Sequence, residues 1–267
     1  MQPQNIFDNE VFFQGYKNLR ENPNSANILE EKPAIFSLLP DLTGKKVLDL
    51  GCGYGENCNL FSKMGAKKVV GIDVSSKMLA IANAENSGDN ILYENICMEN
   101  IFSINEKFDV VVSSLAIHYI HDFSKLVSNV NRLLNDYGIF VFSQEHPLTT
   151  APKDGANWFK NADGSITHYK LTDYAINGER TVSWLVDGIR KYHRTFSSII
   201  NALIDADFTI KKMLEPVPTK EIIARDPSFA KDLHKPNFLV IKAERNNKNI
   251  EKFSATAPTI ITQRTIL

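Results

Sequence analysis

The chain has 267 residues, a formal net charge of −1 at pH 7 and a pI near 6.6. This length suffices for one large α/β domain with an insertion, and the absence of a basic excess argues against a broad nucleic-acid-binding surface. No apolar run reaches the roughly 20 residues that a membrane helix needs, and the first residues lack a signal-peptide pattern. Cys52, Cys58 and Cys97 lack the paired spacing of a disulfide framework or a zinc site. We therefore expect a cytoplasmic protein that holds no metal and acts without a membrane or nucleic acid as partner.

Strand and helix patterns alternate in the order that builds a parallel sheet. Strands are expected near 46–50, 68–73, 91–95, 108–113 and 138–145, and amphipathic helices near 55–64, 76–86 and 122–134. A helix over 193–207 and strands at 208–215 and 237–243 complete the sheet. Ser75 is placed to cap the helix over 76–86. Right-handed crossovers bring the carboxyl ends of the strands to one edge, where a ligand crevice is expected.

The first strand runs into a glycine-rich turn, Gly51 to Gly55, that opens a helix. Glycines there let the backbone bend sharply and let a ligand approach main-chain N–H groups. The third glycine comes one residue earlier than in the dinucleotide pattern, and Glu56 stands where that pattern has glycine, so a pyrophosphate is disfavoured. Asp73 ends the second strand, where a carboxylate accepts hydrogen bonds from ribose hydroxyls. The pattern indicates a nucleoside ligand without phosphates.

These two motifs, Asp49 to Gly55 and Gly71 to Ser75, resemble the class I S-adenosylmethionine-dependent methyltransferases. The resemblance continues through Lys77–Leu79, Phe108–Tyr119 and Leu133–Ser143, and extends from about Pro33 to Ala243. A narrower similarity to an uncharacterised bacterial branch of small-molecule-type methyltransferases lies in 16–20, 145–147 and 192–195. The resemblance implies a doubly wound, Rossmann-like sheet of seven mostly parallel strands, with the last strand antiparallel, and S-adenosylmethionine as the cofactor.

The same resemblance implies a cofactor site around the glycine turn. Asp49 is expected to meet the cofactor's ammonium group directly or through water, or instead to hold loop N–H groups. Gly51 and Gly53 admit the methionine part, and Asp73 holds the ribose. The residues expected at the cofactor are Asp49, Gly51, Cys52, Gly53, Asp73, Val74, Met78, Cys97, Met98, Ser114 and Leu115.

The adenine end of that site departs from the family pattern. Val74, Met78 and Met98 are expected to sandwich the base, although methionine also fills irregular gaps in protein cores. Many relatives have an aspartate that accepts a hydrogen bond from the adenine amine, and this chain has Cys97 there. Sulfur is a weak acceptor, so the role falls to main-chain groups near Met98, or Glu99 takes it.

Residues 146–192 break the alternating order and contain both tryptophans. We interpret this stretch as a lid inserted after the fifth strand, above the place of the acceptor; the alternative for each ring is a small satellite core. The chain is expected to form a methyltransferase domain over 1–245, with an N-terminal helical cap at 1–45, and a tail at 246–267. The residues expected to contact the acceptor are Tyr16, Arg20, Tyr119, Glu145, Trp158, Tyr174, Trp184 and Arg194. Arg194 and Arg180 are candidates to hold an acidic acceptor, with solvent-facing ion pairs as the default interpretation.

Transfer of a methyl group from a sulfonium needs in-line placement of the acceptor, exclusion of water and, for an O–H or N–H acceptor, a route for the proton. His118, His146 and His193 are the candidate proton acceptors, each with a purely structural alternative. The sequence favours a methyltransferase acting on a small molecule. The alternatives are an NAD-type oxidoreductase, which needs room for a pyrophosphate, and a protein that binds S-adenosylmethionine without catalysis.

Overall fold

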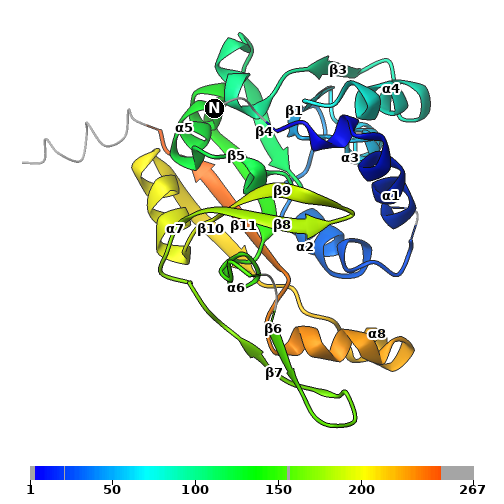
Figure 1. Ribbon diagram of the computed structural model, residues 1–267. Coiled ribbons are helices and arrows are strands. Elements are labelled where there is room, and N and C mark those ends of the chain that lie inside the picture. The colour runs from blue at the N-terminus through cyan, green and yellow to red at the C-terminus, as the bar shows by residue number, and fades with distance from the viewer. Residues whose placement is uncertain (1–3, 21, 155–156, 248–267) are drawn as a thin grey trace, which may run out of the picture.

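The computed structural model of the chain describes residues 4–20, 22–154 and 157–247. Its centre is a seven-stranded sheet in the order β10-β11-β5-β4-β1-β2-β3 (Figure 1). The strands are β1 (Lys46–Leu50), β2 (Lys68–Asp73), β3 (Ile91–Asn95), β4 (Phe108–Ser113), β5 (Leu134–Glu145), β10 (Phe208–Leu214) and β11 (Phe238–Arg245). β11 runs antiparallel to both its neighbours, whereas β1 to β5 pair in parallel. The predicted Rossmann-like, mostly parallel sheet is confirmed, including its antiparallel last strand.

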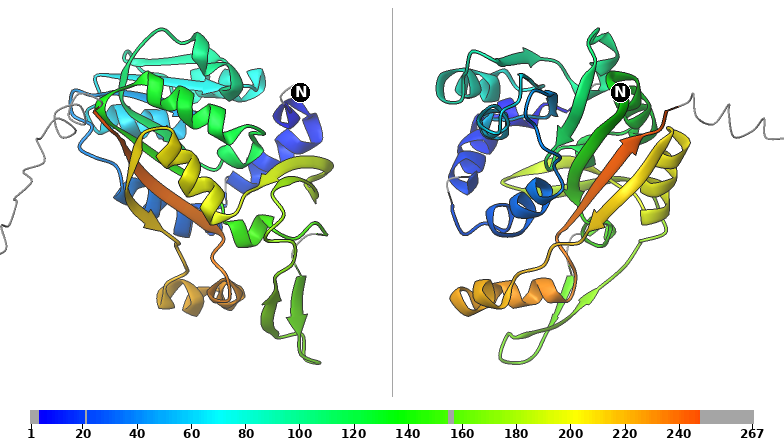
Figure 2. Two further views of the ribbon diagram at one scale, coloured as in Figure 1. Left: turned by 90° about the vertical axis from the view of Figure 1, so that its left-hand side faces the viewer. Right: turned by 180° about the vertical axis from the view of Figure 1, so that it is seen from behind.

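Helices cover both faces of this sheet (Figure 2). α5 (Phe123–Leu133) and α7 (Phe196–Asp205) pack on one apolar cluster, and α2 (Lys32–Ser37) and α3 (Glu56–Lys63) pack on another. α4 (Ser76–Glu85) packs beside β2 and β3. Both faces of the central strands are therefore dry, which explains why β1, β2 and β4 read as nearly continuous apolar runs.

Local sequence signals fix most of these boundaries. Ser75 caps α4 as predicted, because its Oγ accepts a hydrogen bond from the Met78 N–H at 3.1 Å. The predicted start at His193 of the helix over 193–207 is wrong. His193 is the last residue of a strand, and α7 begins at Phe196, after Thr195, whose Oγ1 accepts from the Ser198 N–H.

The chain between β5 and α7 forms α6 (Pro147–Thr150) and two hairpins that point in different directions. The hairpin of β8 (Gly178–Trp184) and β9 (Val186–His193) lies across the front of the molecule and reaches toward α1 (Glu10–Arg20) (Figure 1). The hairpin of β6 (Asn157–Lys160) and β7 (Ile166–Lys170) projects from the opposite end, near α8 (Lys220–Arg225) (Figures 1 and 2). Only the β8–β9 hairpin is positioned to cover the carboxyl edge of the sheet.

Short helices complete the fold: η1 (Ile6–Asp8), η2 (Asn27–Glu31), η3 (Met98–Ser103), η4 (Ile117–Tyr119) and η5 (Pro227–Leu233). In the described part of the chain, no helix combines the length and the apolar character required to cross a membrane. The predicted tail, 246–267, lies outside the described residues from position 248 onward.

Candidate active site

The turn after β1 is shaped by two glycines at the carboxyl edge of the sheet. A Cβ on Gly51 would lie 2.6 Å from the Cβ of Ala116, so any side chain would force this loop apart. Gly53 has φ +54°, and a Cβ there would meet nothing within 4 Å. Its N–H donates to Asp73 Oδ2 at 2.9 Å, while the Ser75 N–H donates to Oδ1 at 2.8 Å. The Asp73 carboxylate thus joins the glycine turn to the start of α4.

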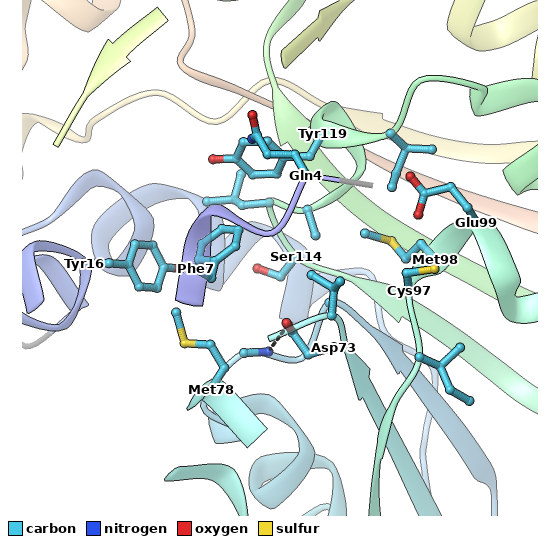
Figure 3. A pocket seen from close by; sticks show the side chains of 17 residues that line it. Gln4, Phe7, Tyr16, Asp73, Met78, Cys97, Met98, Glu99, Ser114 and Tyr119 are labelled. Atoms are coloured by element: carbon cyan, nitrogen blue, oxygen red, sulfur yellow. Dashed lines mark hydrogen bonds between the residues drawn. The ribbon is translucent and has the colours of Figure 1, made fainter. Parts of the chain in front are cut away.

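A first cavity opens above this turn (Figure 3). Tyr16 and Phe7 line one side, Cys97, Met98 and Glu99 line the other, and Asp73 and Ser114 lie between them. The predicted cofactor residues that line it are Gly51, Gly53, Asp73, Val74, Met78, Cys97, Met98, Ser114 and Leu115. Among its described lining residues, the charged side chains are Asp73 and Glu99, with no lysine or arginine. This acidic, partly apolar slot fits a nucleoside with a positively charged substituent better than one with phosphates.

Two predicted cofactor residues, Asp49 and Cys52, do not line the cavity. Asp49 is 1% exposed and accepts a hydrogen bond from the thiol of Cys58 at 3.4 Å. Burial raises the pKa of the Asp49 carboxyl to about 7. Asp49 therefore supports the turn from below, and a link to the cofactor's ammonium group through water stays a prediction.

A second cavity adjoins the first. The two share four lining residues, Phe7, Tyr16, Leu115 and Tyr119. The second is further lined by Leu19, Arg20, Ser25, Ala26, Asn27, His118, Glu145, Trp184 and Phe238. Six of the residues predicted for the acceptor or for catalysis come together here: Tyr16, Arg20, Tyr119, Glu145, Trp184 and His118. The arrangement provides one compartment for a nucleoside and a neighbouring one, rich in aromatic rings, for a second molecule.

The family follows from comparisons with known proteins. A model for the methyltransferase domain matches residues 48–142. A crystal structure of an S-adenosylmethionine-dependent methyltransferase from Mesorhizobium loti superposes with a TM-score of 0.76 at 37% identity, over 83% of this chain and 98% of that one. The chain belongs to the S-adenosylmethionine-dependent methyltransferases. Its cofactor is therefore S-adenosylmethionine, and the NAD-type oxidoreductase is excluded.

Other relatives of this methyltransferase differ in how much they cover. An uncharacterised protein of Haemophilus influenzae is 42% identical in an alignment of 254 residues that covers 91% of this chain and 98% of that protein. A ubiquinone biosynthesis O-methyltransferase of Pasteurella multocida is 37% identical in an alignment of 114 residues that covers 38% of this chain and 47% of that protein. The second similarity covers less than half of each protein.

The electrostatics of the second cavity centre on a buried ion pair. Lys191, which sequence reasoning missed, donates from Nζ to Glu145 Oε1 at 2.5 Å. Its ammonium group lies 5.2 Å from the ring centroid of Trp184 and 5.9 Å from that of Tyr119. Burial acts to raise the pKa of the Glu145 carboxyl, but its interactions with the protonated form of His118 and with the hydrogen-bonded Lys191 ammonium group outweigh burial and lower the pKa. The pair joins the end of β5 to β9 and so fastens the β8–β9 hairpin over the cavity.

Two other titratable groups of the cavity offer no unpaired charge at neutral pH, because His118 is neutral and Arg20 is paired. Burial lowers the pKa of His118 to about 4, so its imidazole is neutral, and its Nδ1 faces the Glu145 N–H at 3.5 Å. Arg20 donates to Glu56 Oε2 at 2.7 Å and to Asn27 Oδ1 at 2.6 Å. Glu56, which replaces the third dinucleotide glycine, thus anchors α1 at the mouth of the site.

The structure does not bring His146 and His193 to either cavity. His146 accepts from the backbone N–H two residues on through Nδ1, and its Nε2 lies 2.9 Å from Glu215 Oε1. His193 bonds to the hydroxyl of Thr150 at 2.8 Å and to the carbonyl oxygen of Tyr174 at 2.8 Å. Both rings have two partners within the fold, and the structural alternative accounts for them.

Three predicted acceptor residues also lie elsewhere. Trp158 packs on Tyr169, with ring centroids 4.9 Å apart, in the β6–β7 hairpin that points away from the cavities. Tyr174 accepts at its hydroxyl from a backbone N–H of α7. Arg194 is buried and donates to the carbonyl oxygens of residues 120 and 121. Arg180 likewise donates to backbone carbonyls, at 2.7 Å and 2.9 Å, so neither arginine forms the expected solvent-facing ion pair.

Sequence reasoning also missed a buried carboxyl behind the loop after β4. Glu31 is fully buried and accepts hydrogen bonds from the hydroxyls of Ser114, at 2.9 Å, and Ser143. Ser143 in turn accepts from the Leu115 N–H at 3.0 Å, which holds Leu115 at φ +50°. That value is uncommon for a residue other than glycine, and such strain is typical of functional loops. The network fixes the loop that lines both cavities.

Proposed function

We propose that this methyltransferase transfers the methyl group of S-adenosylmethionine to a small-molecule acceptor in the second cavity by in-line displacement. The observation that carries the proposal is the shared wall of the two cavities, Phe7, Tyr16, Leu115 and Tyr119. Because these four residues line both cavities, the cavities adjoin, and a donor in one and an acceptor in the other can come into direct contact. Cover by α1 and the β8–β9 hairpin helps to keep water from the reacting groups.

The residues of the first cavity fit the cofactor part by part. Asp73 has lone pairs left for ribose hydroxyls after accepting its two backbone hydrogen bonds. Val74, Met78 and Met98 offer apolar surfaces to the adenine, and Gly51 leaves the backbone accessible to the methionine part. When bound, the cofactor supplies an electrophilic methyl group on a sulfonium. The rings of the shared wall stabilise such a positive charge by roughly 0.5–2 kcal/mol.

A small acceptor is favoured over a polymer by charge and shape. The net charge of −1 shows no basic excess of the kind that favours nucleic acid, and the second cavity is lined by Trp184 and by Glu145, which pairs with Lys191 of the hairpin. We infer that residues 1–245 act as one catalytic domain, in which the segment up to 45 and the β8–β9 hairpin cover the site. Free thiols at Cys52, Cys58 and Cys97 agree with a reducing cytoplasm.

The test is to incubate the enzyme with methyl-labelled S-adenosylmethionine and a cell extract that has been separated into low-mass and macromolecular fractions. Label should appear in low-mass products with the native enzyme and should be strongly reduced with Asp73→Ala. Label confined to protein or nucleic acid would refute a small-molecule acceptor.

A further inference from the structure

The charges that line the second cavity are compensated within the protein. Among its described lining residues, Arg20 and Glu145 carry charge at neutral pH. Arg20 is bonded to Glu56 and Asn27, and Glu145 is bonded to Lys191. An acceptor with a carboxylate or phosphate would find no unpaired cation here and would lose its hydration without compensation. The cavity therefore favours an uncharged molecule.

The shape and lining of the cavity favour a ring. Tyr16, Tyr119 and Trp184 contribute aromatic faces, and Phe7 lies edge-on to Tyr119 with ring centroids 5.8 Å apart. Trp184 is itself edge-on to Tyr16, at 6.1 Å. Rings held rigidly in this way stack on or edge against another ring, each contact adding about 0.5–1.5 kcal/mol beyond the area buried.

Glu145 has one carboxylate oxygen to spare in this aromatic cavity. Oε1 accepts from Lys191, whereas Oε2 has no hydrogen-bond partner among the described residues. The side chain of Glu145 is 23% exposed, and it lines the cavity. In a mostly apolar site, a carboxylate oxygen without a hydrogen-bond donor is stabilised by a ligand that donates an O–H or N–H to it.

His118 does not compete for this role. Its Nδ1 faces the Glu145 N–H, so the neutral ring carries its proton on Nε2 and acts as a donor. Lys191 and Arg20 are donors as well. Glu145 is the one described side chain of this cavity with an anionic oxygen free to accept a proton.

We propose that the acceptor is a neutral aromatic or heteroaromatic compound with an O–H or N–H group, and that Glu145 accepts the proton of that group. The inference rests on the proposed function. The acceptor oxygen or nitrogen forms a bond to the methyl carbon, the carbon–sulfur bond breaks with its electron pair going to sulfur, and the acceptor's proton passes to Oε2 of Glu145. Lys191 is a positioning residue that keeps the carboxylate ionised and oriented.

The first experiment determines whether the acceptor is neutral or anionic. The low-mass extract is separated by ion exchange into neutral and anionic fractions, and each is incubated with the native enzyme and methyl-labelled S-adenosylmethionine. Label should enter an aromatic product from the neutral fraction. Label that arises from the anionic fraction, or in a product without a ring, would overturn the assigned class. No label in any low-mass fraction would refute the proposed function itself.

The second experiment tests whether Glu145 accepts the proton, with the active neutral fraction as substrate. Glu145→Gln keeps the size of the side chain and an oxygen for Lys191 but loses the basic group, so turnover should fall by about 100-fold or more. S-adenosylmethionine affinity and melting temperature should stay close to native, and Glu145→Asp should recover part of the rate. A rate for Glu145→Gln within a few-fold of native would overturn the proton-acceptor role.

A pH profile separates this role from a structural one. The charged and titratable groups that face Glu145 are His118, Tyr119, Lys191 and Lys235. The loss of activity caused by Glu145→Gln should shrink as pH rises, because the acceptor then ionises by itself. As pH is lowered, the activity of Lys191→Met should begin to fall at a higher pH than that of the native enzyme. A deficit that is constant at every pH would show that Glu145 acts only through the fold.

Discussion

Replacing Asp73 by alanine should weaken S-adenosylmethionine binding strongly. Asp73 lines the first cavity, and each of its oxygens accepts one backbone hydrogen bond, so lone pairs remain on both for the ribose. Loss of charged hydrogen bonds to ribose costs on the order of 2–3 kcal/mol, or about a 30- to 150-fold rise in Kd. Calorimetric titration of the purified variant gives the value directly.

The two backbone hydrogen bonds of Asp73 require controls, because alanine also releases the N–H groups of Gly53 and Ser75. Asp73→Asn keeps one acceptor oxygen and should lose less affinity than alanine. Asp89→Ala removes an exposed carboxylate outside both cavities and should bind as the native protein does. Native affinity in a folded Asp73→Ala protein, or binding of NAD in preference to S-adenosylmethionine, would refute the reasoning.

Three further predictions concern the adenine end, the cover and the buried histidine. Cys97→Asp should tighten S-adenosylmethionine binding several-fold in a direct titration, because a carboxylate accepts from the adenine amine better than sulfur; equal or weaker binding would mean that Cys97 does not face that amine. Trp184→Ala should reduce turnover with little change in cofactor Kd, whereas Trp158→Ala should methylate normally; kinetics showing equal losses would contradict this division of the insertion. The pKa of His118 is about 4 when folded against about 6.5 unfolded, so the unfolded state binds more protons between these values and stability falls as pH drops. About 2 kcal/mol should be lost between pH 8 and pH 5 by this group. Denaturant titrations of His118→Gln should lack this loss, and those of His168→Gln, an exposed control, should retain it.

The cofactor half of the site could be predicted because its residues are local in sequence. A buried strand, a glycine turn and an acid at the end of the next strand lie within Lys46–Asp73, and parallel pairing brings Asp49 opposite Gly71. The hydrophobic period and one capping residue were enough to place α4. The same signals gave the wrong start for α7, because residues 193–195 contain no glycine or proline to mark the end of the strand before the helix.

The acceptor half could be predicted only in part, because tertiary contacts assemble it. Lys191 alternates with its neighbours like a residue on the solvent face of a strand, and only the fold turns it toward Glu145. Glu31 reaches Ser143 across 112 positions of sequence, which no local pattern reveals. Trp158 and Trp184 looked equivalent in the sequence, and the two hairpins separate them.

The central claim, that the reacting methyl group lies at the wall shared by the two cavities, is tested most directly by nuclear magnetic resonance with S-adenosylmethionine labelled in its methyl group. The bound methyl should show nuclear Overhauser contacts to ring protons of Tyr16 or Tyr119, and substitution of the contacting ring by leucine should remove them. A bound cofactor whose methyl group contacts neither ring would contradict the account.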